Sequence, residues 1–153
     1  MKWKNRRFHQ LTNLELYNIL QLRNRVFVIE QNCIYQDADG KDKQAQHIFL
    51  KNGHEIVAYL RVFKAGDYFD KPSIGRIVTH PDYRKKGYAT EAIFKAINLI
   101  CNGWHERFIE ISAQTYLIDY YKRLGFNPIG TPYLEDNILH IRMLYDKENI
   151  PQY

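Results

Sequence analysis

The chain of 153 residues carries 45% hydrophobic and 14% aromatic residues, which is enough for one folded domain with a proper core and too little for two ordinary domains. Its 22 Lys and Arg exceed its 17 Asp and Glu, and this scattered excess of +5 suits a polyanionic ligand without predicting a nucleic-acid-binding surface. No apolar run approaches the roughly 18 residues of a membrane span, and no apolar signal segment follows the basic N-terminus, so we expect a single cytoplasmic domain over residues 1–153.

The first third of the chain predicts a strand, a helix and a polar loop. Residues 1–10 fit the strand, and Thr12 and Glu15 have the spacing of a capping box, in which each side chain accepts a hydrogen bond from the other residue's backbone N–H. The helix that begins there places apolar side chains on one face: Leu16, Ile19, Leu20 and Phe27. The polar residues 31–43 interrupt this pattern.

Three aspartates mark the polar segment: Asp37, Asp39 and Asp42. Its start resembles a calcium-binding loop, but Asp42 stands where that loop needs a glycine and Ile48 stands where it needs a bidentate glutamate. This excludes a calcium site. The segment is then either a solvated loop or the acidic wall of a cleft that binds a cationic amine.

A hairpin and a third strand follow. Residues 47–50 and 55–63 predict two strands, and Asn52-Gly53 between them is a strong signal for a hairpin turn. A loop over 66–72 then leads to a strand over 73–79.

The most informative stretch is 78–90, where an apolar strand stops at Pro81 and a basic turn leads into a helix. The first backbone N–H groups of a helix have no intrahelical partners and carry partial positive charge. Gly87 lets an anion approach the main chain without a Cβ in the way. The turn therefore predicts a phosphate site, and the alternative is a solvated, charged connection.

The last third of the chain predicts a strand over 107–113, a helix over 115–124 and a strand over 138–145. This alternation of strands and helices predicts an α/β fold with a mixed sheet and helices on both faces. Cys33 and Cys101 have no metal-binding spacing, so we expect free thiols and no metal site.

Two signatures resemble those of the GNAT N-acetyltransferases. Residues 84–89, Arg-Lys-Lys-Gly-Tyr-Ala, are similar to the R/Q-x-x-G-x-G/A pattern whose loop amides grip the pyrophosphate of acetyl-CoA. Residues 120–126, Tyr-Tyr-Lys-Arg-Leu-Gly-Phe, resemble that family's aromatic-Tyr pair before Gly-Phe. Segments 25–47 and 135–143 further resemble the ElaA-like branch, with Asn137 where glycine is usual, so the resemblance covers residues 1–145.

The resemblance implies a GNAT-like α/β fold, with a mixed, mostly antiparallel central sheet flanked by helices on both faces. It also implies an acetyl-CoA-dependent N-acyltransferase, in which a primary amine of a small molecule or a protein attacks the thioester directly in a ternary complex. The backbone of 77–79 would contact the pantetheine arm, and the 84–90 turn would hold the pyrophosphate. The implied cofactor-binding residues are Ile77, Val78, Thr79, Arg84, Lys85, Lys86, Gly87, Tyr88, Ala89 and Thr90.

Direct acetyl transfer needs a base that deprotonates the amine and an acid that protonates the leaving thiolate. Tyr121 matches the family position whose phenol faces the sulfur, so we expect it to be the general acid; the alternative is an ordinary core aromatic residue. For the general base, the resemblance leaves several residues open: Glu30, His47, His140, Glu135 and Asp136. Each has a structural alternative, because a glutamate can pair with a nearby cation and a strand histidine can be held by hydrogen bonds.

Two other functions are alternatives. A CoA-binding regulatory or interaction module would bind acetyl-CoA without turnover. A small basic nucleic-acid-binding protein would use the N-terminal cations and the 84–86 cluster, although no RNA- or DNA-binding motif is recognisable. We expect acetyl-CoA and an amine acceptor as partners, without nucleic acid or membrane. The apolar segment 150–153 either docks on a partner subunit in a homodimer or frays.

Overall fold

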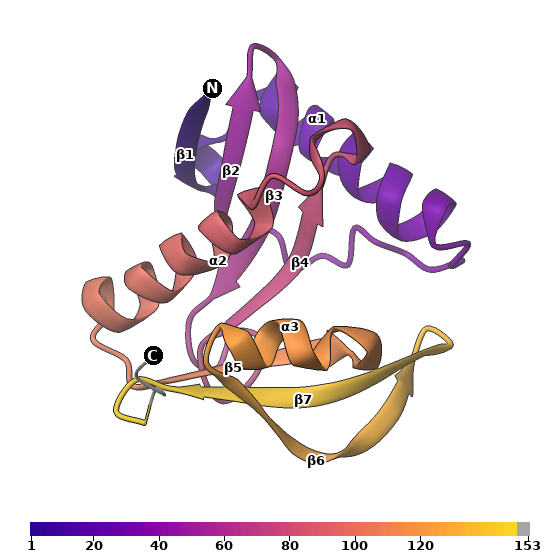
Figure 1. Ribbon diagram of the computed structural model, residues 1–153. Coiled ribbons are helices and arrows are strands. Elements are labelled where there is room, and N and C mark those ends of the chain that lie inside the picture. Colours follow the sequence, from indigo (N-terminus) through magenta and orange to yellow (C-terminus); the bar gives the residue numbers. More distant parts are fainter. Residues whose placement is uncertain (150–153) are drawn as a thin grey trace.

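Residues 1–149 are described by the computed structural model, and their strands form one sheet in the order β1-β2-β3-β4-β5-β7-β6 (Figure 1). Every neighbouring pair is antiparallel except β4 and β5, which are parallel. The strands are β1 (Lys2–Arg7), β2 (Gln46–Asn52), β3 (Glu55–Phe63), β4 (Ser73–Thr79), β5 (Phe108–Gln114), β6 (Phe126–Glu135) and β7 (Ile138–Asp146). The helices are α1 (Asn13–Arg23), α2 (Tyr88–Asn98) and α3 (Ile118–Arg123). The predicted mixed, mostly antiparallel sheet is confirmed, whereas the segment 150–153 lies outside the described residues.

Helix α1 begins at the predicted capping box. Thr12 Oγ1 accepts a hydrogen bond from the Glu15 amide at 3.0 Å, and Glu15 Oε2 accepts one from the Thr12 amide at 3.3 Å. The buried apolar side chains of α1 and of the turn after it are Ile19, Leu22 and Val26. The predicted face is therefore only partly correct, because Leu16 and Leu20 are half-buried. The chain continues after α1 as a wide π-helical turn, Asn24–Glu30, whose wider spacing breaks the regular helical periodicity.

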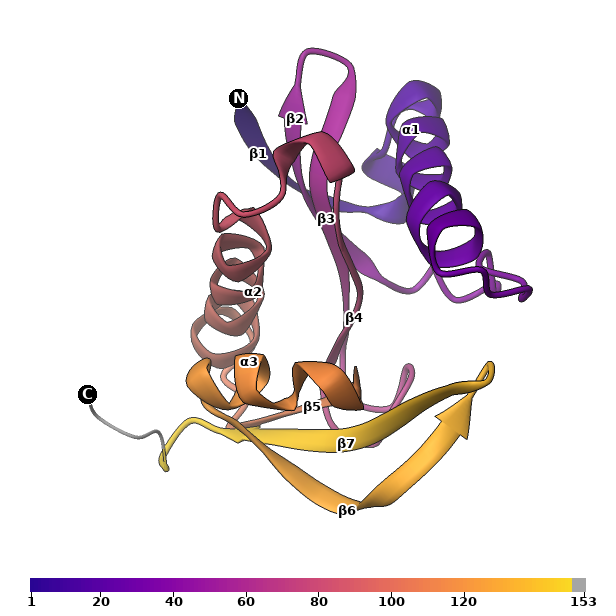
Figure 2. The same cartoon turned by 45° about the vertical axis from the view of Figure 1, so that its right-hand side comes forward.

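Helices α1 and α2 cover opposite faces of the β2–β4 part of the sheet (Figure 2). Helix α2 packs four buried apolar residues against that sheet: Ala92, Ile93, Ala96 and Ile97. The hairpin between β2 and β3 turns through Gly53, whose φ of +62° is the left-handed conformation that glycine adopts without strain. The Asn-Gly pair therefore predicted this turn correctly.

Strand β6 was not predicted, because its sequence contains residues that usually end strands. Pro128, Gly130 and Pro132 all lie within it, and its pairing with β7 shifts register between Ile129 and Tyr133. Proline is tolerated on an edge strand, where its missing N–H faces away from the sheet, and β6 is an edge strand. Pairing with β7 therefore makes β6 a strand despite its unfavourable composition.

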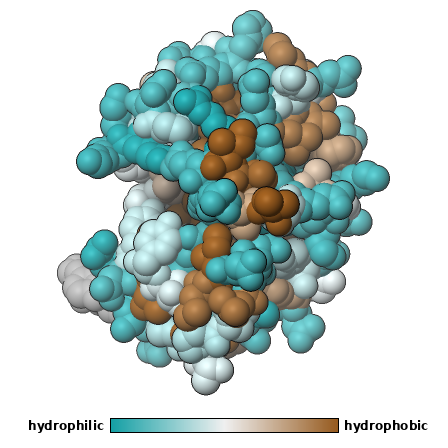
Figure 3. Space-filling view, turned by 90° about the vertical axis from the view of Figure 1, so that its right-hand side faces the viewer, coloured by the Kyte–Doolittle hydropathy of each residue, from teal (hydrophilic) through white to brown (hydrophobic). Residues whose placement is uncertain are grey.

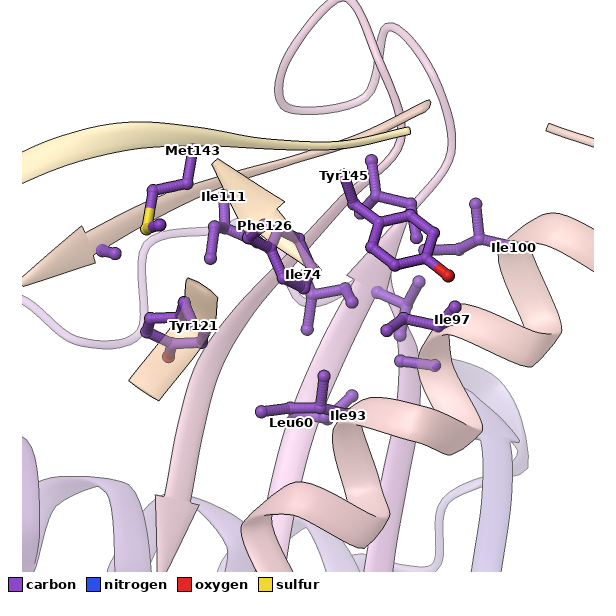
Figure 4. Packing of buried hydrophobic residues seen from close by; sticks show 14 of the residues in the cluster. Leu60, Ile74, Ile93, Ile97, Ile100, Ile111, Tyr121, Phe126, Met143 and Tyr145 are labelled. Carbon is purple, nitrogen blue, oxygen red and sulfur yellow. The ribbon is translucent and has the colours of Figure 1, made fainter. Parts of the chain in front are cut away.

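The sheet divides into two parts because β4 and β5 diverge. Their ladder contains one registered pair, Ser73 with Glu110, and beyond it β4 and β5 run in different directions (Figures 1 and 2). One hydrophobic core spans the divide and joins residues of β3, β4 and α2 to residues of β5, α3, β6 and β7 (Figure 4). Side-chain packing therefore holds the two parts together around an opening in the hydrogen-bond ladder.

No helix within residues 1–149 is both long enough and apolar enough to cross a bilayer. On the face shown in Figure 3, apolar side chains lie in several patches, with polar side chains between and around them. The large apolar side chains that are most exposed in the chain include Ile29, Ile34, Tyr116 and Leu134. Polar side chains therefore break up the apolar surface of this face.

Candidate active site

A cavity of about 800 Å³ occupies the region where β4 and β5 diverge. It is bounded by β4, the 83–90 turn, the 26–36 segment, β5 and the hairpin of β6 and β7. The cavity brings together most of the sequence-predicted site residues: Glu30, Ile77, Val78, Thr79, Arg84, Lys85, Gly87, Tyr88, Ala89, Thr90, Tyr121 and His140. Two predicted residues, His47 and Lys86, do not line it.

Strand β4 presents main-chain groups to this cavity. In its pairing with β3, Gly75 stands opposite Arg61 and Val78 stands opposite Tyr59, so that two residues of β4 share the space of one residue of β3. This β-bulge bends the strand, and Arg76 within it has a left-handed φ of +50°. Because β5 has already turned away, residues 75–79 form no ladder with it, and their main chain faces the cavity.

The 84–90 turn, called the anion turn below, has the features of an anion site. Gly87 is the N-cap of α2, with a φ of +81°, and no side chain caps the helix, so its first N–H groups have no side-chain partner among the described residues. Thr90 Oγ1 and the Tyr120 hydroxyl are 2.8 Å apart, which ties the first turn of α2 to α3. Arg84 and Lys85 line the cavity beside these amides. The turn therefore combines main-chain donors with cationic side chains, a combination that fits a pyrophosphate.

Glu30 and Arg84 face each other across the opening of the cavity. Arg84 donates two hydrogen bonds to the Glu30 carboxylate, at 2.6 and 3.0 Å. These hydrogen bonds hold the pKa of Glu30 below its ordinary value of 4.5. Glu30 is therefore an ionised carboxylate engaged with a residue of the anion turn.

Tyr121 lies between the core and the cavity. Its side chain packs edge-on against Tyr120 and Phe126, and its hydroxyl points away from Phe126 and Met143 (Figure 4). Burial raises the pKa of this phenol, so it keeps its proton at neutral pH. The side chain is 7% exposed and lines the cavity, so it serves the core and faces the site at once.

His140 lies at the opposite end of the cavity, on β7. Its Nδ1 donates a hydrogen bond to the Ile138 carbonyl at 2.7 Å, because a carbonyl oxygen can only accept. Its Nε2 lies 3.2 Å from Glu135 Oε2, and its ring stacks on Tyr133. The ring is thus fixed in orientation, with a carboxylate beside its second nitrogen.

The chain is similar to known proteins along most of its length. Residues 16–147 match the family described as acetyltransferase (GNAT) domain. The chain belongs to the GNAT acetyltransferase family. A UPF0039 protein from Synechocystis sp. is 34% identical over 146 residues, which are 95% of this chain and 95% of that protein.

Two solved structures with the GNAT fold are similar to this chain in sequence as well as in fold. The crystal structure of Escherichia coli ElaA has a TM-score of 0.88 and 33% identity, and the match covers 95% of this chain and 100% of that chain. An acyl-CoA N-acyltransferase from Pseudomonas aeruginosa has a TM-score of 0.88 and 34% identity, covering 95% and 99%. The predicted GNAT membership and the ElaA-like resemblance are confirmed, and the protein is a GNAT-type N-acyltransferase.

His47 lies in the GNAT domain away from the cavity. Its Nε2 donates to the Asp42 carbonyl at 2.9 Å, and its Nδ1 accepts from the Tyr59 hydroxyl at 2.7 Å. Burial lowers the pKa of this imidazole from 6.5, so the ring is neutral. Both nitrogens are therefore engaged within the fold, and the structure does not bring His47 together with the other candidate bases.

The loop aspartates are paired with buried arginines. Arg23 of α1 lies 2.8 Å from Asp37 Oδ2 and 2.7 Å from Asp42 Oδ1. Arg61 of β3 lies 2.7 Å from Asp39 Oδ2 and 2.9 Å from Asp42 Oδ1. Burial alone would raise the pKa of Asp39 and Asp42, but hydrogen bonds from the arginines hold both pKa values below 3.8. The prediction of a solvated loop is therefore wrong for these aspartates. Of the three, only Asp39 lines the cavity, and Arg61 balances its charge.

Several cavity residues were missed by the sequence analysis, among them Arg61, Arg76 and Tyr35. Arg76 lies 2.8 Å from Asp37 Oδ1 and stacks over the Tyr35 ring at 5.4 Å. One signal was available, because Arg61 interrupts an otherwise apolar strand and a buried arginine requires a carboxylate partner. Within residues 1–149, no group of three or more His, Cys, Asp or Glu side chains could hold a metal ion.

Proposed function

We propose that this GNAT enzyme moves an acetyl group from acetyl-CoA to a primary amine, which attacks the thioester directly in a ternary complex. One observation carries the proposal: a single cavity is lined by the anion turn, by the edge of β4 that does not pair with β5, and by Tyr121 of α3. Acetyl-CoA, when bound, supplies the activated acyl group. The similar P. aeruginosa protein, described as an acyl-CoA N-acyltransferase, is consistent with this reaction.

In the proposed complex, the anion turn holds the pyrophosphate and β4 holds the pantetheine arm. The uncapped amides of α2, with Arg84 and Lys85, supply donors and positive charge. The main chain of 77–79 supplies hydrogen bonds along the arm, in place of those that β5 does not make. Most of these groups belong to the backbone, so the cofactor end of the cavity depends on the conformation of the chain.

Tyr121 is the proposed general acid. Its raised pKa keeps the phenol protonated at neutral pH, and it can donate that proton to the departing thiolate. Its contacts with Tyr120 and Phe126 fix the ring, so the hydroxyl needs no reorganisation before it donates.

His140 is the proposed general base, with Glu135 as its partner. The Ile138 carbonyl fixes the proton on Nδ1, so a proton taken from the amine would be held at Nε2. The Glu135 carboxylate, 3.2 Å away, would stabilise the imidazolium that forms.

Calorimetric titration with acetyl-CoA tests the proposal, with Gly87→Glu beside the wild type. We expect binding near one-to-one in the wild type and at least about 10-fold weaker binding in the variant, since several charge-assisted hydrogen bonds are lost. Gly53→Glu is the matched control, because Gly53 also has a positive φ, has open space around it and does not line the cavity. Equal affinity of all three proteins would refute the phosphate site. A protein that binds acetyl-CoA but acetylates no amine in a broad panel would instead be a binding module.

A further inference from the structure

The ion pair between Glu30 and Arg84 joins two segments that are separated by 54 positions in the chain. Glu30 ends the wide turn after α1, and Arg84 begins the anion turn. Both residues line the cavity, and their side chains are 42% and 40% exposed. The pair therefore lies across the entrance to the site and is open to solvent, where an ion pair is easily exchanged for another.

Once an acyl-CoA is present, Arg84 can bind either the Glu30 carboxylate or the pyrophosphate. The guanidinium fork matches a carboxylate and a phosphate equally well in shape, because both offer two oxygens to two parallel N–H groups. A pyrophosphate at the amides of α2 carries more charge than one carboxylate. Arg84 pairs with Glu30 through Nη1 and Nη2, so this edge of the guanidinium cannot hold the pyrophosphate at the same time.

Few other cations would replace Arg84 beside Glu30. Arg25 is the other arginine whose charge acts on Glu30, and its Nη1 lies 3.2 Å from His80 Nε2. Among the described residues, Arg84 is the one side chain that hydrogen-bonds the Glu30 carboxylate. Loss of that contact leaves a carboxylate exposed at the cavity without a direct partner.

We propose that Glu30 and the pyrophosphate of the acyl-CoA compete for Arg84, so that Glu30 closes the empty site and cofactor loading opens it. This inference rests on the proposed function. The Glu30 carboxylate, which is already ionised, then loses its direct partner.

The test is the affinity for CoA, measured by calorimetry for the wild type and for Glu30→Gln. Removal of the competing carboxylate should tighten CoA binding by about 2- to 5-fold, the range expected for an exposed ion pair. Pantetheine, which lacks the pyrophosphate, should bind both proteins equally. Equal or weaker CoA binding by Glu30→Gln would overturn the proposal, because Glu30 would then merely position Arg84.

Two further proteins make the result specific. Asp136→Asn removes the same unit of charge from the cavity lining without touching Arg84, and Asn suits the left-handed φ of +49° there. Asp136→Asn should not tighten CoA binding as Glu30→Gln does. An equal increase in affinity would show that any loss of negative charge from the cavity has this effect, and would overturn the proposed competition. In an Arg84→Ala background, Glu30→Gln should give no gain. Failure of the wild type to bind CoA at all would instead refute the proposed function.

Discussion

Tyr120 and Tyr121 are neighbours in the chain with different surroundings. The Tyr120 hydroxyl shares a hydrogen bond with Thr90 at the start of α2. The Tyr121 hydroxyl has no hydrogen-bond partner among residues 1–149, although the ring itself is packed. A phenol that is held in place but keeps its proton free is suited to proton donation, and Tyr120 provides the control.

We expect Tyr121→Phe to lower kcat by at least about 100-fold, because proton donation to the thiolate is lost. Its Kd for acetyl-CoA should change little, since the ring and the anion turn are unaffected. Tyr120→Phe should retain most of the activity. Steady-state kinetics with an amine identified by screening, together with calorimetry, measure both quantities. If kcat is the same in wild type and Tyr121→Phe, the phenol has no part in the reaction.

At the scale of elements, the loop after α1 is anchored by charge. Its aspartates form ion pairs with arginines of three elements, α1, β3 and β4, so the loop conformation depends on ion pairs inside the protein. Removing one partner of a buried ion pair leaves an uncompensated charge in a region of low dielectric. The anchoring arginines are therefore required for stability even though the loop is polar.

Arg23→Ala should lower the free energy of unfolding by about 3 to 5 kcal/mol, because Asp37 and Asp42 both lose a buried partner. Urea unfolding measures this change. Arg107→Ala is the matched control, since Arg107 also makes two hydrogen bonds to an aspartate, Asp146, but at the surface. It should have a much smaller effect, and comparable losses in the two variants would show that burial is not the cause.

Local signals in the sequence predicted the elements that local chemistry decides. Thr12 with Glu15 identified the start of α1, Asn52-Gly53 the hairpin, and Gly87 the start of α2. The strand β6 could not be found in this way, because its pairing with β7 makes it a strand despite two prolines.

The same limit applies to the candidate site. Most residues of the 84–90 turn line one cavity together with Tyr120 and Tyr121, whereas Lys86 does not. The surroundings of the loop aspartates and of His47 were not predictable, because their partners come from other elements of the fold. Spacing in the sequence carries no information on such contacts.

At the scale of the whole molecule, His47 links stability to pH. The folded protein holds this imidazole neutral, so unfolding takes up a proton at pH values between its lowered pKa and 6.5. Stability therefore falls as the pH drops below 6.5. Asp39 and Asp42, whose pKa values lie below 3.8, add a separate loss in more acidic solution.

We expect the wild-type Tm to decrease between about pH 7.5 and 5, and His47→Gln to show a shallower decrease from a lower starting Tm. Glutamine keeps one donor and one acceptor but takes up no proton in this range. Differential scanning calorimetry across the interval measures both slopes. Parallel slopes for the two proteins would assign the acid sensitivity to other groups.

The divergence of β4 and β5 divides the cavity into an end made of main chain and an end made of side chains. The anion turn and β4 offer amides and carbonyls that most sequences would provide in the same conformation. The opposite end is formed by side chains such as Arg76, Glu135 and His140. On the proposed function, substitutions at that end would change which amine is accepted while the donor of the acyl group stays the same. A fold divided in this way can change its specificity for the amine while it keeps its site for the acyl-CoA.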